Sequence, residues 1–227
     1  MHNHTSFSTD GLMSPRSLLV AAQAKGLGCI AVTDHNTVKG GVRALELADA
    51  DPSLPRVIPG IELMTEVGEV VGLYVREEIP ARIPLTEAVE RIRELGGLVY
   101  LPHPFDVFRR GAIEPTEREK AAQLADLIEV VNGRALGPRA GIRSSQLAGR
   151  YAKPGGAGSD AHREREVGRA YVVVGRTPTR DDLVELVARG RVEHSLGAWE
   201  YGTNWFMQAS SPMTRAWRKI KGNLPEE

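Results

Sequence analysis

The pattern of hydrophobic and polar positions divides the chain into short apolar runs separated by amphipathic stretches. The apolar runs are bounded by glycine, proline or polar residues, which is typical of buried strands. They cover residues 29–32, 57–62, 70–75, 98–101, 127–131, 155–158, 171–174 and 192–196. Helical spacing of apolar residues predicts helices over 15–25, 39–50, 86–95, 117–124, 142–151 and 181–189. Strands alternating with helices in this way predict a mostly parallel sheet covered by helices.

Several of the predicted helices carry local signals at their ends. Ser14 followed by Pro15 is typical of an N-cap and a first helical residue, and Gly26 predicts the end of that helix. Thr86 is expected to cap the helix that ends before Gly96. Periodicity and end signals therefore predict the same elements.

The length of 227 residues suits one large α/β domain, and no linker, repeat or change of composition divides the chain. We expect a single domain over residues 1–227, with 198–227 as a C-terminal extension on its body. Within that extension, residues 212–221 fit a basic amphipathic helix. Such a helix could bind a membrane surface or nucleic acid, but docking on the body with its basic side chains in solvent is the simpler interpretation.

Charge and cysteine content exclude several classes of partner. The 29 basic and 29 acidic residues cancel, which argues against a broad basic surface for duplex nucleic acid but not against a small anionic substrate. The one cysteine, Cys29, lies in an apolar run and is expected to be a buried small residue rather than a nucleophile. The sequence shows neither a signal peptide nor a membrane-length apolar segment, so a cytoplasmic protein without a membrane partner is expected.

Two histidines open the chain, at positions 2 and 4. In an extended segment the side chains of His2 and His4 point to the same side, where they can hold one metal ion between them. A disordered terminus or a remnant of an expression tag would explain the same residues. The choice depends on whether the rest of the chain supplies further ligands.

Metal-binding residue types recur at or just after the carboxyl ends of predicted strands. The residues in this position are His2, His4, His35, Glu62, His103, Asp160 and His162. In a parallel sheet or barrel those strand ends lie on one face, where active sites are built. Nitrogen and carboxylate donors without a thiolate suit Mn²⁺, Zn²⁺ or Fe²⁺ better than a structural zinc site. So many donors predict two or three divalent ions that share carboxylates.

Short motifs follow one another in a set order along the chain. They are His2-x-His4, Ser8-Thr9-Asp10-Gly11, Thr33-Asp34-His35, Gly60-Ile61-Glu62, His103-Pro104 and Ser159-Asp160-Ala161-His162. From residue 2 to about residue 175, this order resembles the PHP (polymerase and histidinol phosphatase) family of metal-dependent phosphoesterases. The resemblance implies a distorted (β/α)₇ TIM-like barrel with a metal centre at its carboxyl-terminal mouth. It also implies hydrolysis of phosphate esters by a metal-activated hydroxide.

Motif by motif, the resemblance implies three sets of metal ligands. The first set is His2, His4, Glu62 and Asp160. The second is Asp10, His35 and His162. The third shares Glu62 and uses His103. An aspartate at position 10, where histidinol phosphatases carry histidine, makes the chain more similar to a particular branch. That branch removes the 3′-phosphate of nucleoside 3′,5′-bisphosphates or trims short oligonucleotides from the 5′ end. The expected partner is therefore a small phosphorylated substrate or a short single-stranded oligonucleotide.

The chain departs from the family pattern at two places. Members usually have a hydrophobic strand before the histidine pair, whereas this sequence starts at Met1. We therefore expect either a missing upstream segment or a very short first strand. Glu69 stands where many relatives carry a histidine of the third metal, and it is expected either to bind that ion or to be a solvated residue at a strand end.

Residues 132–134 follow the predicted strand 127–131 onto the same face. The Arg134 guanidinium can hold phosphate oxygens through two parallel hydrogen bonds, so Arg134 and its neighbour Asn132 are expected to bind substrate. Arg134 is also expected to stabilise charge during the reaction, with Arg139 and Arg143 as rival candidates. His103 is expected to act as a general acid where it does not bind a third ion.

Two other functions fit the same residues. One is a phosphatase for histidinol phosphate or a sugar phosphate. The other is a non-catalytic barrel that binds a nucleotide or a partner protein, which the short first strand would favour. Metal content and the preference among phosphate esters distinguish these alternatives.

Overall fold

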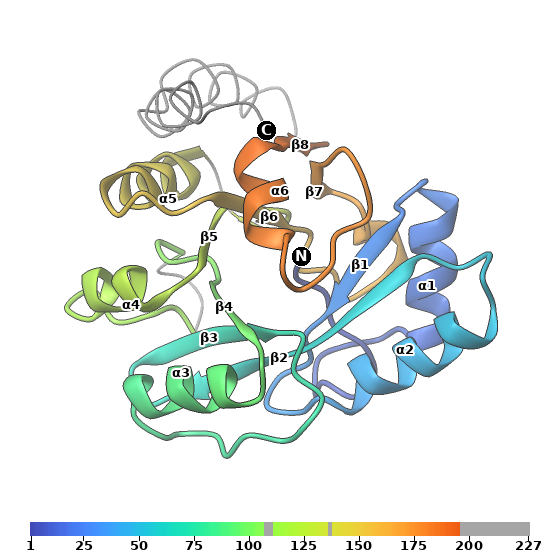
Figure 1. Ribbon diagram of the computed structural model, residues 1–227, viewed down its shortest axis with the longest axis horizontal. Helices are drawn as coiled ribbons and strands as arrows, with labels where there is room; N and C mark the ends of the chain where they lie inside the picture. Colours follow the sequence, from blue (N-terminus) through green and yellow to red (C-terminus); the bar gives the residue numbers. More distant parts are fainter. Residues whose placement is uncertain (107–110, 136–137, 196–227) are drawn as a thin grey trace, which may run out of the picture.

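A six-stranded sheet organises the computed structural model, which describes residues 1–106, 111–135 and 138–195. Its strands are adjacent in chain order (Figure 1). They are β1 (Cys29–Val32), β2 (Arg56–Thr65), β3 (Gly68–Leu73), β4 (Leu98–Leu101), β5 (Leu127–Asn132) and β6 (Gly155–Gly158). All neighbouring pairs are parallel except that β3 runs antiparallel to both β2 and β4. The mostly parallel sheet is confirmed, with one reversed strand.

The reversal of β3 follows from the short connection that precedes it. Only Glu66 and Val67 separate β2 from β3, and a parallel crossover needs a dozen residues or more. The two strands therefore form a hairpin in which Met64 pairs with Glu69. This register brings Glu69, at the start of β3, to the same edge of the sheet as the carboxyl ends of the parallel strands.

The first residues of the chain bridge the two edges of the curled sheet. The Asn3 carbonyl accepts a hydrogen bond of 2.9 Å from the N–H of Thr33, just beyond β1. On the other side, the His4 N–H donates to the Ala161 carbonyl, beyond β6, at 2.9 Å. The result is a distorted TIM-like barrel, the expected class, in which a short bridge replaces a regular strand.

Five helices cover the outer face of the sheet (Figure 1). They are α1 (Pro15–Ala24), α2 (Lys39–Ala50), α3 (Leu85–Glu94), α4 (Arg118–Leu124) and α5 (Pro138–Arg150). Leu18 of α1 and Ala44 of α2 pack against Val32 of β1 in one core cluster. A second cluster joins α3, α4 and α5 to the other strands, with Ile92 and Ile128 fully buried in it.

The last described elements follow β6, and α6 among them covers the amino-terminal end of the barrel. They are a short 3₁₀ helix η1 (Glu164–Glu166), β7 (Ala170–Val173), α6 (Leu183–Arg189) and β8 (Arg191–His194), with β7 and β8 paired antiparallel. Leu183 and Val187 of α6 pack with Tyr100 and Leu127 in a third cluster. Burial of each such aliphatic side chain contributes about 1.5–3 kcal/mol. The polar site lies at the opposite end.

Most predicted helix signals are confirmed, with one exception. The Ser14 side chain caps α1 by accepting a hydrogen bond of 3.0 Å from the N–H of Ser17. The prediction for Thr86 is wrong, because α3 already begins at Leu85 and has no side-chain cap. Pro84 before that helix fixes the backbone entry instead.

Cys29 is half-buried rather than fully buried. Its surroundings still raise the pKa of the thiol to about 11, chiefly through burial, which disfavours the reactive thiolate. The expected extension over 198–227, with its helix over 212–221, lies outside the described residues. Within the described ranges, no helix combines the length and apolarity needed to cross a membrane.

Candidate metal centre

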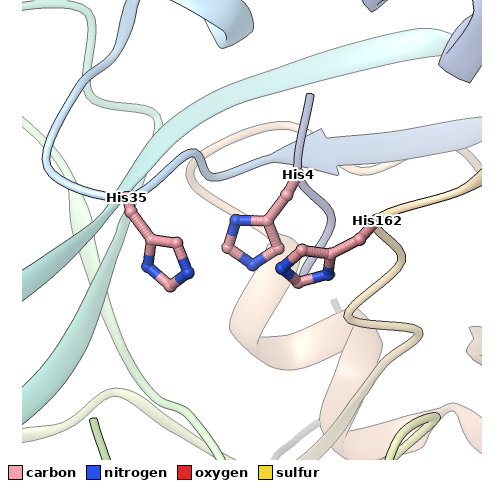
Figure 2. Close-up of side chains that lie close together, drawn as sticks. All are labelled: His4, His35 and His162. Carbon is pink, nitrogen blue, oxygen red and sulfur yellow. The ribbon is translucent and has the colours of Figure 1, made fainter. Parts of the chain in front are cut away.

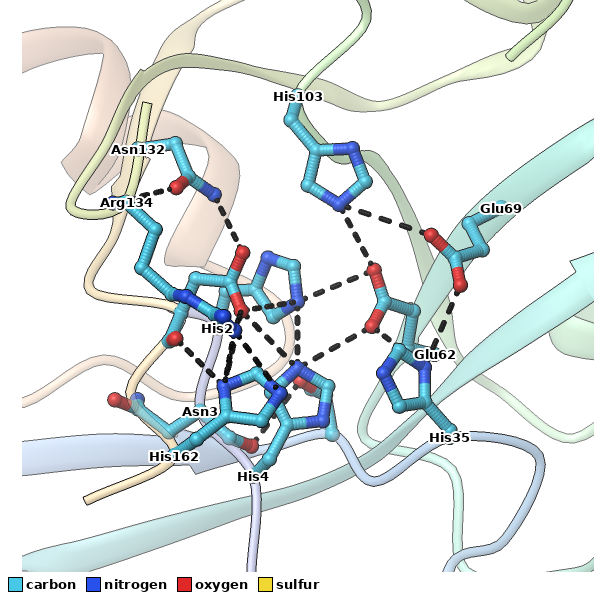
Figure 3. Close-up of polar contacts among 12 residues, drawn as sticks. His2, Asn3, His4, His35, Glu62, Glu69, His103, Asn132, Arg134 and His162 are labelled. Carbon is cyan, nitrogen blue, oxygen red and sulfur yellow. Dashed lines mark hydrogen bonds and ion pairs between the residues drawn. The ribbon is translucent and has the colours of Figure 1, made fainter. Parts of the chain in front are cut away.

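The carboxyl-terminal end of the barrel gathers all eight side chains that the sequence analysis names as metal ligands. Figure 3 labels the five histidines among them and Glu62. The bridging segment, the loop after it, β2 and the segments after β1, β4 and β6 supply them. These residues are His2, His4, Asp10, His35, Glu62, His103, Asp160 and His162. All except Asp10 and His35 are buried.

The first predicted ligand set is the most compact. The Nε2 atoms of His2 and His4 are 3.0 Å apart. Glu62 places one oxygen 3.2 Å from His2 Nε2 and the other 3.3 Å from His4 Nε2, and Asp160 Oδ1 is 3.4 Å from His4 Nε2. Donors ~2.1 Å from a common ion, at tetrahedral or octahedral angles, lie about 3.0–3.4 Å apart. His2, His4 and Asp160 each offer a donor atom within 4.8 Å of the others, which fits one divalent ion, and Glu62 borders this group.

The second predicted set lies beside it, towards solvent. Asp10 Oδ2 is 3.0 Å from His162 Nε2 and 3.6 Å from His35 Nε2. The rings of His35 and His162 converge on His4 (Figure 2), with ring centroids 4.4 and 4.3 Å from that of His4. Although partial burial opposes ionisation, His162 and His35 hold the pKa of the Asp10 carboxyl below its usual value.

The third set includes Glu69, for which the sequence left two interpretations open. Its carboxylate lies 3.4 Å from His35 Nδ1 and 3.8 Å from His103 Nε2, and the latter atom is 3.1 Å from Glu62 (Figure 3). A Cβ at Gly111 would overlap this carboxylate, so the glycine makes room for it. Burial, and next the charge of Glu62, raise the pKa of Glu69 to about 8. Glu69 therefore points into the cluster and is not a solvated residue.

Glu129 of β5 supports the cluster from below and was not identified from the sequence. Its carboxylate accepts hydrogen bonds from the His103 N–H at 2.8 Å, Asn132 Nδ2 at 2.9 Å and the Tyr100 hydroxyl at 3.1 Å. It also contacts Nδ1 of His2 at 3.3 Å. Although burial opposes ionisation, His2 holds the pKa of Glu129 below its usual value. One buried carboxylate thus orients two of the candidate ligands.

Ser8 and Asp34 form the corresponding support for His4. The Ser8 hydroxyl donates to Asp34 Oδ1 at 2.8 Å and accepts from the His35 N–H at 2.9 Å. The same oxygen lies 3.2 Å from Nδ1 of His4. Asp34 is fixed in turn by the N–H of Thr5 at 2.6 Å. The motif residues between the ligands therefore hold the ligands in place.

These contacts assign the tautomers of His2 and His4. An ionised Glu129 only accepts hydrogen bonds, so Nδ1 of His2 must carry the proton. The Ser8 hydroxyl gives its single proton to Asp34, so Nδ1 of His4 must also be a donor. In the neutral rings, both Nε2 atoms are therefore unprotonated, and their lone pairs face one another.

Those lone pairs are 3.0 Å apart and are bordered by the carboxylates of Glu62 and Asp160. The cluster therefore needs a positive charge at its centre. Although burial opposes a charged ring, Glu62 and then Asp160 raise the pKa of His2 well above its usual value, which reflects the same need. A divalent cation would supply this positive charge while the imidazoles stay neutral, as metal-bound histidines require. The donor set fits the predicted group.

Two of the candidate ligands have left-handed backbone conformations, His103 with φ of 25° and Asp160 with φ of 50°. Non-glycine residues rarely adopt this region, and strained residues concentrate at functional sites. His103 is held in place by the hydrogen bond of its N–H to Glu129. The fold thus maintains both conformations at the mouth of the barrel.

Arg134 and Asn132 occupy different environments. The Arg134 side chain is 40% exposed and places Nη1 2.8 Å from a His162 ring nitrogen and 3.8 Å from Asp160. Asn132 is buried and donates to both Glu129 and Asp160, while its oxygen accepts from the Arg134 N–H. The structure therefore gives Asn132 internal contacts, and the substrate contact expected for it stays a prediction.

The packing beneath the cluster predicts a sensitive glycine. A Cβ at Gly158 would overlap the Glu129 carboxylate and approach the His2 side chain. We expect Gly158→Ala to lower the free energy of unfolding by about 1–3 kcal/mol, the typical cost of overpacking. Gly149→Ala in α5 is the control, since nothing lies within 4 Å of the added carbon and helix propensity improves by about 0.5–1 kcal/mol. Chemical denaturation checks both, and equal stability of the two variants would contradict the packing.

A barrel with a polar site at the carboxyl ends of its strands defines the class of protein. The model of the PHP domain family matches residues 1–148, and that of a PHP-associated segment matches residues 139–192. The chain belongs to the PHP family. The family match, the fold and the clustered donors support a metal-dependent phosphoesterase.

Several known proteins are similar to this chain. An uncharacterized protein of Methanocaldococcus jannaschii is 35% identical over 76% of this chain and 68% of its own length. The 5′-3′ exoribonuclease Rnm of Salmonella typhimurium is 33% identical over 44% of this chain, but the match covers only 35% of that protein. A two-domain Bacteroides vulgatus protein, described as containing a predicted PHP-like metal-dependent phosphoesterase, superposes with a TM-score of 0.66. It is 20% identical over 86% of this chain and 64% of that one.

Proposed function

We propose that this protein hydrolyses phosphate esters of nucleotides, either nucleoside 3′,5′-bisphosphates or short single-stranded oligonucleotides. The observation that carries the proposal is the convergence of histidine and carboxylate donors from six parts of the barrel, with an exposed arginine beside them. The name of the Salmonella relative supports the oligonucleotide arm.

In this proposal the three ligand sets hold divalent ions. His2, His4, Glu62 and Asp160 hold the first, and Asp10, His35 and His162 hold the second. Glu62, Glu69 and His103 form a third position. Bound ions of this kind lower the pKa of water towards ~7 and neutralise charge on phosphoryl oxygens.

The chain's own residues then bind and orient the ester. Arg134, partly exposed above His162, binds the phosphate oxygens and stabilises the charge that develops on them. Asn132 positions Arg134 through the Arg134 N–H. When Nε2 of His103 carries a proton, it can donate this proton to the leaving alkoxide, whereas the unprotonated atom can bind the third ion, so the two roles exclude one another.

The test is a panel of phosphate esters assayed with Mn²⁺. We expect phosphate release from adenosine 3′,5′-bisphosphate or short RNA to exceed release from histidinol phosphate, and at least two ions per chain after Mn²⁺ loading. A preference for histidinol phosphate would replace the substrate class. Fewer than two ions per chain without turnover of any ester would favour a non-catalytic barrel instead.

A further inference from the structure

The ring of Phe105, close to His103 in the chain, contacts the guanidinium groups of two arginines, one from each of two neighbouring helices. Arg118 of α4 places Cζ 4.7 Å from the ring centroid, and Arg143 of α5 places Cζ 4.2 Å from it. Each guanidinium gains from the π-face of the ring, but the two positive charges also repel one another. The arrangement therefore concentrates positive charge around a single ring.

Neither charge is neutralised within the described part of the chain. Arg118 is only 7% exposed, and its Nε donates to the Pro104 carbonyl at 2.6 Å. No described carboxylate lies within ion-pair distance of Arg118 or of Arg143. By contrast, Arg150, on the same helix as Arg143, pairs with Glu119 of α4. Buried cations are normally paired, so the buried Arg118 together with the exposed Arg143 on the other side of Phe105 is suited to an anion from outside the chain.

The position of Phe105 places this charge beside the candidate metal centre. Phe105 comes two positions after His103, and two residues of chain span at most about 7 Å. The helix that carries Arg143, α5, begins at Pro138, soon after Asn132 and Arg134 at the carboxyl end of β5. The charge around Phe105 is thus close enough to the metal centre to meet a second phosphate of an ester whose reacting phosphate lies there.

We propose that Arg143, stacked on Phe105 and backed by Arg118, binds a second phosphate group of the substrate. The inference rests on the proposed function and deepens it, because it selects substrates with two phosphates over those with one. The occupant is either the 5′-phosphate of a nucleoside 3′,5′-bisphosphate or the next phosphodiester of a short RNA. Arg143 is exposed and makes the contact, while Arg118 fixes the ring and the Pro104 carbonyl.

The test compares matched substrates with the Mn²⁺-loaded full chain. We expect Arg143→Ala to lower the ratio of kcat/KM for adenosine 3′,5′-bisphosphate to that for adenosine 3′-monophosphate by at least about tenfold, the effect of one charge-assisted hydrogen bond. Arg150→Ala, on the same helix, should keep the wild-type ratio. The ratio is also measured with a 5′-phosphorylated RNA trinucleotide in place of the bisphosphate. If Arg143→Ala lowers the ratio only with this trinucleotide, the occupant of the site is the diester. An unchanged ratio with both substrates would overturn the proposal.

Equilibrium binding separates this proposal from the proposed function. If the wild type releases no phosphate from any ester, the hydrolytic function fails, but the subsite can still be tested with the same protein. Adenosine 3′,5′-bisphosphate should then bind Arg143→Ala at least about tenfold more weakly than Arg150→Ala in calorimetric titrations. Equal affinities of the two variants would rule out the second phosphate site, whether or not the protein hydrolyses esters.

Discussion

The Glu62→Gln variant is expected to release phosphate from its preferred ester more than about 100-fold more slowly than the wild type. Loss of a residue that only hydrogen-bonds a metal ligand costs ~10–100-fold, and loss of a shared ligand should cost more. Both Glu62 oxygens are shared. One lies 3.2 Å from His2 and 3.1 Å from His103, and the other lies 3.3 Å from His4 and 3.1 Å from His35. Glutamine removes the negative charge and replaces one oxygen by an NH₂ group, which cannot bind a cation.

Metal content and turnover together check this prediction. After Mn²⁺ loading and removal of free ions, mass spectrometry should find fewer ions per chain in Glu62→Gln than in the wild type. Glu66→Gln, an exposed glutamate in the turn between β2 and β3, should retain both metal and activity. Circular dichroism establishes that each variant is folded. A folded Glu62→Gln protein with wild-type metal content and turnover would remove Glu62 from the site.

The elements could be predicted from the sequence because each one is short and clearly bounded. The strand Cys29–Val32 and the helix Lys39–Ala50 have the bounds that periodicity and turn residues indicate. The direction of β3 was not predicted, although the information was present. Only residues 63–69 separate the two predicted strands, which is already too few for a parallel crossover, and the true strand ends leave only residues 66–67.

The closure of the barrel could not be predicted, because it depends on contacts between distant segments. A pattern of apolar residues is needed to recognise a strand, and the opening residues are polar. Asn3 and His4 bridge Thr33 and Ala161 through backbone groups that any side chain would leave available. The suspected weakness of the first strand is thus offset by hydrogen bonds on both sides.

The candidate ligands could be predicted because they share one position relative to the strands. Glu129, which holds two of them, lacks this shared position. Glu129 lies inside an otherwise apolar run, and an acid there was the one available signal that it contacts something polar. Asp34 precedes a predicted ligand and was read only as part of a motif. The hydrogen-bond donors of a buried carboxylate come from neighbouring strands, and only the fold shows which strands are neighbours.

The second large effect is expected for Glu129→Gln, which should weaken divalent-ion binding by ~10–100-fold, the usual cost of losing a partner of a metal ligand. The carboxylate accepts from His103, Asn132 and Tyr100 and fixes Nδ1 of His2. An amide nitrogen cannot accept, so at least one of these donors loses its partner, which costs about 1–3 kcal/mol for a buried group. The His2 ring is then free to place its proton on Nε2, towards the ion.

A chelator-competition titration with Mn²⁺ measures the affinity, and nitrogen-15 spectra of the histidine rings report the tautomer of His2 in the metal-free protein. Tyr100→Phe is the matched control, because it removes one donor and leaves the carboxylate, so its loss of affinity should be smaller than that of Glu129→Gln. The two variants also separate positioning from stability. Tyr100→Phe leaves a buried acceptor with one donor fewer, yet it does not alter the contact with Nδ1 of His2. If Glu129→Gln bound Mn²⁺ as tightly as the wild type, with the His2 tautomer unchanged, the carboxylate would support only the fold.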